Sequence, residues 1–220
     1  AVAACLVLCI AIPLGVYAGA YPKRASSKLI MSGSILGISL PSFWVGMMMI
    51  YIFAVVLRLL PASGRGNTVM VGNVALSIFA PGGIRYVILP AITLALTNVA
   101  TMLRLTRSGI LENMRQDYIK FARAKGVPAK SILFGHALKN ALIPVVLFFG
   151  MDLGNMIAFT TITETIFAWP GMGKLLIDAI NKSDRPIIVA YLMAAACMFV
   201  VLNFIVDILY TLIDPRIELR

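Results

Sequence analysis

The chain has 220 residues, of which 60% are hydrophobic and 13% charged, and it carries a formal net charge of +10. A soluble domain has roughly 25% charged residues, so this composition argues against a soluble enzyme or binding module. Apolar stretches of about 20 residues, long enough to cross a bilayer, recur along the chain. They are continuous rather than alternating, which argues against a transmembrane β-barrel. We therefore expect an all-α polytopic membrane protein.

Five apolar stretches predict five spans, at about 1–20, 29–60, 86–103, 141–162 and 187–213. The second stretch is long enough to tilt, and Pro41 is expected to kink it. Glycines four residues apart place small residues on one helix face, where helices can approach closely. The pairs are Gly15/Gly19, Gly33/Gly37 and Gly150/Gly154.

The loops between the spans predict the orientation of the chain. Residues 104–139 hold eight bases and two acids, a net +6 of the total +10. Because loops rich in Lys and Arg stay on the cytoplasmic side, this segment and the loop at 21–28 are predicted to be cytoplasmic. The loops at 61–85 and 164–186 then lie outside, and the tail "DPRIELR" lies in the cytoplasm. This placement accounts for the charge without nucleic acid as a partner.

The same orientation puts residue 1 outside, within an apolar stretch and without an initiator Met. We expect an N-terminally truncated chain, with five spans here and six in the complete protein. A removed signal peptide is the alternative.

The segment at 107–140, called the basic loop below, predicts two short helices. On a helix from Asp117 to Lys125, Tyr118, Phe121 and Ala122 share one face. Gly126 can end this helix, and Pro128 suits the first turn of a second helix, at about 129–140, that leads into the fourth span. An apolar face projecting from the membrane needs a partner groove.

Five stretches carry a resemblance to a known family. They are "SLPSFWVG" (39–46), "DYIKFARAKG" (117–126), "HALKNALIPVV" (136–146), "ETIFAWPGMGKLLIDAI" (164–180) and "DPRI" (214–217). The chain resembles the permease subunits of binding-protein-dependent ABC importers, in the dipeptide/oligopeptide/nickel branch, and particularly the first of its two paired permeases. The resemblance implies that residues 1–220 form one transmembrane permease domain with the type I importer (MetI-like) helical bundle.

In that family the basic loop is the "EAA" loop, whose coupling helix docks in a cleft on a cytosolic ATPase. Lys120 stands where the general pattern has Glu. The alternative roles for its bases are contact with lipid headgroups and retention of the loop on the cytoplasmic side. The residues that the resemblance assigns to coupling are Tyr118, Phe121, Ala122, Arg123, Ala124, Lys125 and Gly126.

The resemblance also implies partners: a second permease subunit forming a heterodimer, two cytosolic ATPase subunits and an external or periplasmic solute-binding protein. The protein would be located in the plasma (inner) membrane of a bacterium or archaeon. No Gly-rich P-loop is present, so ATP would be used by the partner subunits and the chain would bind no cofactor. No nucleophile–base set points to an enzyme.

Small peptides are the expected cargo, with nickel or a metal chelate as the alternative. An ion-coupled secondary transporter is a hypothesis from another class, and it predicts inverted repeats and several intramembrane carboxylates. The chain has two scattered acids in its spans, Asp152 and Asp207.

Six residues are candidates for the translocation path: Ser39, Pro41, Phe43, Asp152, Asn155 and Glu164. An ionised group inside a span is costly and usually faces a pathway or a partner, and broken helices often mark transport routes. Glu164 opens a stretch that resembles the family's external segment near the translocation mouth. A structural kink at Pro41 and a helix–helix hydrogen bond from Asp152 are the alternatives.

No metal site is expected. Cys5, Cys9 and Cys197 lie within apolar stretches and lack paired spacing, so we expect buried, reduced thiols. His136 has no neighbouring ligand at metal-binding spacing.

Overall fold

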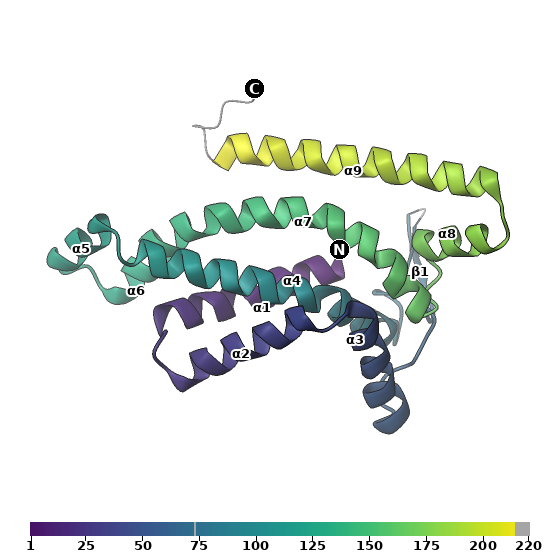
Figure 1. Ribbon diagram of the computed structural model, residues 1–220, viewed down its shortest axis with the longest axis horizontal. Coiled ribbons are helices and arrows are strands. Elements are labelled where there is room, and N and C mark those ends of the chain that lie inside the picture. The colour runs from purple at the N-terminus through teal and green to yellow at the C-terminus, as the bar shows by residue number, and fades with distance from the viewer. Residues whose placement is uncertain (73, 214–220) are drawn as a thin grey trace. The chain divides into compact units, whose positions relative to one another are not determined.

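The structure is a computed structural model that describes residues 1–72 and 74–213. Helices dominate it, and the expected all-α class is confirmed (Figure 1). The elements are α1 (Val2–Ala20), α2 (Ala25–Ser39), α3 (Ser42–Met49), η1 (Ile50–Val56), β1 (Val69–Val71), β2 (Val74–Leu76), α4 (Ile84–Asn113), α5 (Asp117–Ala124), α6 (Ala129–Ser131), η2 (Ile132–Ala137), α7 (Leu138–Ile166), α8 (Met172–Asn181) and α9 (Arg185–Ile213). The two η elements are π-helices. The strands form a small antiparallel hairpin that the sequence did not predict.

Four helical stretches of the described chain are long and apolar enough to cross a membrane. They are Val2–Ala20, Ile84–Asn113, Ala129–Ile166 and Arg185–Ile208. The interrupted pair Ala25–Ser39 and Ser42–Val56 qualifies as a fifth, broken span. The predicted number of spans therefore agrees with the structure.

The chain divides into two compact units. Unit 1 contains Ala1–Leu6, Leu40–Leu96 and Gly154–Val201, and unit 2 contains Val7–Ser39, Thr97–Leu153 and the described chain from Leu202. The long helices α1, α4, α7 and α9 each contribute one part to each unit.

In unit 2, small residues bring helices together. A Cβ on Gly15 would lie 2.6 Å from the Thr106 Cβ, and one on Gly19 would lie 2.7 Å from the Ile110 Cβ. Real Cβ contacts are longer, so α1 and α4 approach to a distance that only glycine permits. The prediction from glycine spacing is confirmed there. It is wrong for Gly33, which has nothing within 4 Å of its Cβ position.

In unit 1, α3 packs on α4 and on the end of α7. A Cβ on Gly46 would lie 3.3 Å from the Thr93 Cγ2 and 3.5 Å from the Phe167 ring. Phe167 is 1% exposed, among the largest fully buried side chains of the described residues. On the same principle Gly154 of α7 accommodates Phe199 of α9. This packing holds the end of α7 in place, where one candidate site begins.

The second span departs from the predicted kinked helix. It begins at Ala25 rather than about 29, is interrupted at Leu40 and Pro41, and ends as a π-helix at Val56. Pro41 has no N–H to continue the helix, and its carbonyl instead accepts the Val45 N–H at 3.1 Å, in the first turn of α3.

Two further expectations need correction. The third span extends to Asn113 rather than 103, so the first residues of the basic loop are helical. The predicted buried thiols are wrong, because Cys5, Cys9 and Cys197 are exposed in this chain, on helix faces that a bilayer can cover.

Candidate functional sites

The basic loop has a small hydrophobic core of its own. Ile119 of α5 is 0% exposed and packs with Ile132 and Ala137 of η2. Met114, Ala122 and Val127 pack around them as partly buried residues. The helix α5 is thereby held against the segment that continues into α7 (Figure 1).

Gly126 makes the turn between the two helical parts of the loop, as predicted. Its φ is +76°, a conformation that L side chains rarely adopt. Nothing lies within 4 Å of its Cβ position, so the backbone conformation, and not the available space, requires glycine. The Val127 N–H donates to the Ala122 carbonyl at 3.1 Å, which closes the end of α5.

Tyr118 connects α5 with two neighbouring helices. Its hydroxyl donates to the Asn113 Oδ1 at 2.8 Å, at the end of α4. It also accepts from the Asn140 Nδ2 at 3.0 Å, in the first turn of α7. The Tyr118 hydroxyl therefore links the loop to both neighbouring helices, α4 and α7.

The other face of α5 presents apolar groups to the surroundings. Phe121 is 62% exposed and Tyr118 is 40% exposed. The Lys125 Nζ lies 4.5 Å from the centre of the Phe121 ring, a cation–π contact that orients the ring. An exposed aromatic pair on a short, well-anchored helix is typical of a contact surface.

The predicted coupling residues divide between these two faces. Ala122 is half-buried and belongs to the core of the loop. The exposed ones are Tyr118, Phe121, Arg123, Ala124, Lys125 and Gly126. Sequence reasoning missed Ile119, although its three-residue spacing from Ala122 is the usual signal of one helix face.

Lys120 is engaged within its own helix. Its Nζ lies 2.7 Å from the Asp117 Oδ1, and both side chains are exposed. The hydrogen bond and charge of Lys120 lower the pKa of Asp117 from its ordinary value of 3.8. The base that replaces the family's Glu is thus partly neutralised where it stands.

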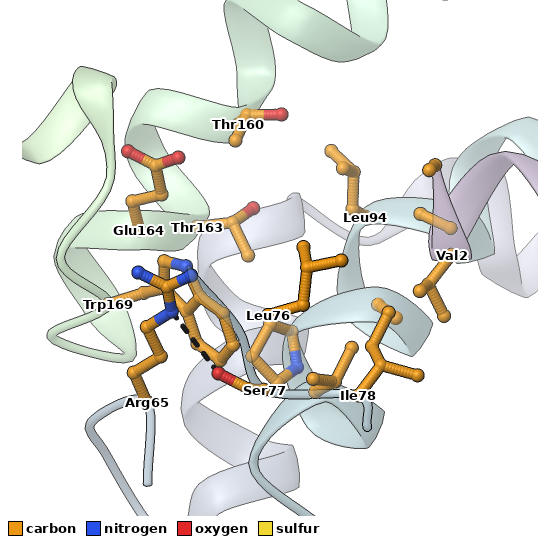
Figure 2. A pocket seen from close by; sticks show the side chains of 15 residues that line it. Val2, Arg65, Leu76, Ser77, Ile78, Leu94, Thr160, Thr163, Glu164 and Trp169 are labelled. Carbon is orange, nitrogen blue, oxygen red and sulfur yellow. Dashed lines mark hydrogen bonds between the residues drawn. The ribbon is translucent and has the colours of Figure 1, made fainter. Parts of the chain in front are cut away.

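A second site lies in unit 1, where a cavity of about 300 Å³ opens beside α7 (Figure 2). Its polar lining residues are Arg65, Ser77, Thr160, Thr163 and Glu164. Apolar residues from α1, β2 and α4, together with Trp169, form the rest. The Arg65 Nε donates to the Ser77 Oγ at 3.2 Å, which ties the 61–85 loop back on itself. The cavity therefore combines apolar walls with a cation and a carboxylate.

Glu164 forms the corner between α7 and α8. Its Oε2 accepts the Lys174 N–H at 3.0 Å, in the first turn of α8, and its carbonyl accepts the Trp169 N–H at 2.8 Å. A carboxylate at a helix N-terminus satisfies otherwise unpaired N–H groups and complements the helix dipole. A Cβ on Gly171 would collide with this carboxylate, so any larger residue there would require the carboxylate to move.

Glu164 and Thr160 also line a neighbouring cavity of about 230 Å³. Thr161 and Tyr191 line it as well, and their hydroxyls are 3.4 Å apart. Glu164 thus lines two cavities of unit 1.

The other candidate path residues lie elsewhere. Asp152 is 7% exposed, on α7 in unit 2. Ser39, Pro41, Phe43 and Asn155 are exposed in this chain. Glu164 is the one among the six candidates that lines the cavity beside Arg65 in the described chain. The roles of all six stay predictions.

Among the described residues, no group of three or more His, Cys, Asp or Glu side chains is placed to hold a metal ion. The "DPRI" stretch at 214–217 lies outside the described residues.

Comparison with known proteins identifies the family. Residues 11–219 match the family described as "Binding-protein-dependent transport system inner membrane component". The chain is 42% identical to the di/tripeptide transport system permease protein DppB of Pseudomonas aeruginosa, over 86% of this chain and 60% of that protein. It is 40% identical to the oligopeptide transport system permease protein AppB of Bacillus subtilis, over 97% of this chain and 66% of that one. For the dipeptide permease DppB of Escherichia coli K12 the identity is 35%, with 95% and 66% covered.

The chain thus spans less than two thirds of the length of these relatives. The match nevertheless covers nearly all of its residues, and its five candidate spans agree with a membrane component. The resemblance inferred from the five sequence stretches is confirmed: the chain belongs to the family of binding-protein-dependent transport system inner membrane components.

Proposed function

We propose that this chain forms the membrane-spanning permease part of an ATP-driven importer for small peptides. Its partners would be a second permease subunit, two cytosolic ATPase subunits and an external solute-binding protein. The observation that carries the proposal is the basic loop, where Tyr118 and Phe121 are exposed on a helix anchored by its own core. The family and the names of the relatives support this assignment.

The geometry of the loop suits the transmission of force. Ile119 packs on η2, and η2 continues without a break into α7. A movement imposed on α5 by an ATPase would therefore move α7 as well. Binding and hydrolysis of ATP by the partners would bias the spans between two states, each open to one side.

Peptides are favoured over nickel or a metal chelate as cargo, because the relatives carry peptide names. The orientation follows from the bases: the basic loop would lie in the cytoplasm, and the chain after α9 would return there. The two cavities beside Glu164 would then belong to the outer part of the path, near the place where a binding protein delivers the peptide.

Co-purification tests the coupling surface in the full-length protein, expressed together with its ATPase and permease partners. Phe121→Glu places a charge on the predicted contact, and we expect the recovered ATPase to fall about tenfold or more, as for an aromatic anchor of an interface. Phe79→Glu is the matched control, because Phe79 is 65% exposed and lies in the loop predicted to be external. It should leave ATPase recovery unchanged.

Equal recovery with both variants would show that α5 does not dock the ATPase. If the native protein recovers no ATPase at all, the importer assignment itself fails. Uptake of a labelled dipeptide by cells carrying each variant gives an independent readout of transport.

A further inference from the structure

We propose that a groove in unit 2 binds one anionic phospholipid, with an acyl chain along the groove and the headgroup phosphate at its basic end. The groove has a volume of about 700 Å³ and lies between α1 and the α6–η2 segment. The inference rests on this groove alone and not on the proposed transport function.

The walls of the groove are apolar along most of their length. Ile12, Pro13 and Val16 line it from α1, and Leu133 and Leu138 line it from the opposite side. Lipid tails are as apolar as these side chains, so a chain of methylene groups can fill the groove without a polar group being left in hydrocarbon.

The length of the groove suits one leaflet. It follows α1 from Ile12 to Tyr21, and nine residues of α-helix rise about 13 Å. One leaflet of the hydrocarbon core is about 15 Å thick, half of the ~30 Å of a bilayer. From the end of the span, the groove thus extends into the membrane about as far as an acyl chain of one leaflet.

Polar groups gather at one end, where α1 finishes. Tyr17 and Tyr21 have ring centres 5.4 Å apart, and the Tyr17 hydroxyl shares a hydrogen bond of 2.8 Å with Ser26. Aromatic residues with a polar tip are typical of the membrane–water boundary. This end of the groove therefore lies at headgroup depth.

One base lines the groove and a second stands beside a residue that lines it. The Arg24 guanidinium carbon lies 4.2 Å from the centre of the Tyr21 ring, and Lys130 lines the opposite wall as an exposed base. No acidic side chain is among the lining residues of the groove in the described chain. Basic pockets between membrane helices attract anionic headgroups, and the order of apolar walls followed by bases matches that of a phospholipid.

Native mass spectrometry of the full-length protein with its partner subunits tests the proposal. The probes are phosphatidylglycerol and phosphatidylcholine with identical acyl chains. We expect the wild type to prefer phosphatidylglycerol, and Lys130→Gln to reduce that preference about fivefold, the usual effect of one base at an anionic surface. Lys139→Gln is the matched control, because Lys139 is an exposed base of the same loop that does not line the groove.

A second variant tests whether the lipid needs the full width of the groove. Ala20 lines the groove and is partly exposed, so Ala20→Leu narrows it without changing charge. It should reduce the binding of both lipids alike while subunit recovery stays at the wild-type level. Glycerol phosphate, which carries the charge but no chain, should not displace phosphatidylglycerol.

Three outcomes overturn the proposal. An equal loss of preference with Lys130→Gln and Lys139→Gln would mean diffuse attraction to an anionic surface. Displacement by glycerol phosphate would mean a free-phosphate site. Absence of retained lipid, with Ala20→Leu instead reducing the recovery of another subunit, would mean that protein covers the groove.

Discussion

The basic loop and the Glu164 corner are both short helical turns after a long helix, yet they orient their side chains in opposite ways. The loop exposes the Phe121 ring and hides an aliphatic core behind it. The corner turns its carboxylate inward, against the Lys174 N–H and Gly171. An exposed apolar group is typical of a surface that binds a partner. A carboxylate that is turned inward and bound by the backbone stabilises the lining of a cavity instead. Substitutions on the exposed face of the loop should therefore affect association, and those in the corner should affect the fold.

The largest expected effect comes from comparing substitutions on the buried and the exposed face of α5. Ile119→Ala removes three buried carbons from the core of the loop and should destabilise the local structure by about 2–5 kcal/mol. Hydrogen exchange of the α5 amides in the full-length protein measures this loss. Phe121→Ala is the control, since its ring is mostly exposed and its loss should change α5 protection little. Similar exchange in both variants would contradict the assignment of the faces.

The corner should respond to a single methyl group. Gly171→Ala places a Cβ against the Glu164 carboxylate, and overpacking of this kind costs about 1–3 kcal/mol. A fall in the melting temperature of the purified protein is expected. Gly33→Ala is the control: Gly33 lies within α2, has open space around it, and should melt at the same temperature as wild type or slightly higher. A stable Gly171→Ala protein would mean that the carboxylate can leave its place at no cost.

The two hydrogen bonds of the Tyr118 hydroxyl should contribute less to the stability of the loop. Tyr118→Phe keeps the ring but removes both hydrogen bonds to Asn113 and Asn140, which should weaken the loop by about 1 kcal/mol. Faster hydrogen exchange at the start of α7, with ATPase recovery nearly retained, would support this contribution. Loss of ATPase recovery equal to that of Phe121→Glu would instead assign the hydroxyl to the contact surface.

The smallest effect concerns pH. Lys120 lowers the pKa of Asp117 below its ordinary 3.8, so the folded pKa lies below the unfolded one. The contribution of this pair is therefore fully present above the unfolded pKa and is lost as the pH falls through the folded pKa. Carboxyl NMR of the Asp-labelled protein should show the low pKa, and Lys120→Met should return it towards 3.8. A value unchanged by Lys120→Met would exclude the pair in solution.

Much of the fold could be predicted, because its signals are local. Continuous apolar runs indicated the spans, and Gly126 indicated the turn of the basic loop that its positive φ confirms. The interruption at Pro41 was predicted in position but not in extent. Whether a helix bends or stops at proline is not decided by the proline alone. Here a new helix starts directly after it, with the Val45 N–H donating to the Pro41 carbonyl.

The sites were predicted less completely, because they depend on contacts between distant residues. Five of the eight residues of α5 are apolar, and they cover too much of the helix circumference for periodicity alone to choose a buried face. Ile119 is buried, and Phe121 is not, because Ile119 packs on Ile132 and Ala137 across the turn. Likewise, nothing near Glu164 in the sequence indicates that Arg65 lines the same cavity.

The π-helix η2 can absorb a change in the length of the chain. It occupies six residues, Ile132–Ala137, between α6 and α7, and a π-turn holds about one residue more than an α-turn. If one residue were deleted there, the segment could relax to an α-helix with nearly the same total rotation, so α5 would keep its direction. A residue deleted from the α-helical start of α7 would instead rotate everything before it by about 100° around the helix axis. The direction of the aromatic face of α5 is thus set by the number of residues behind it, with a tolerance of one residue at η2.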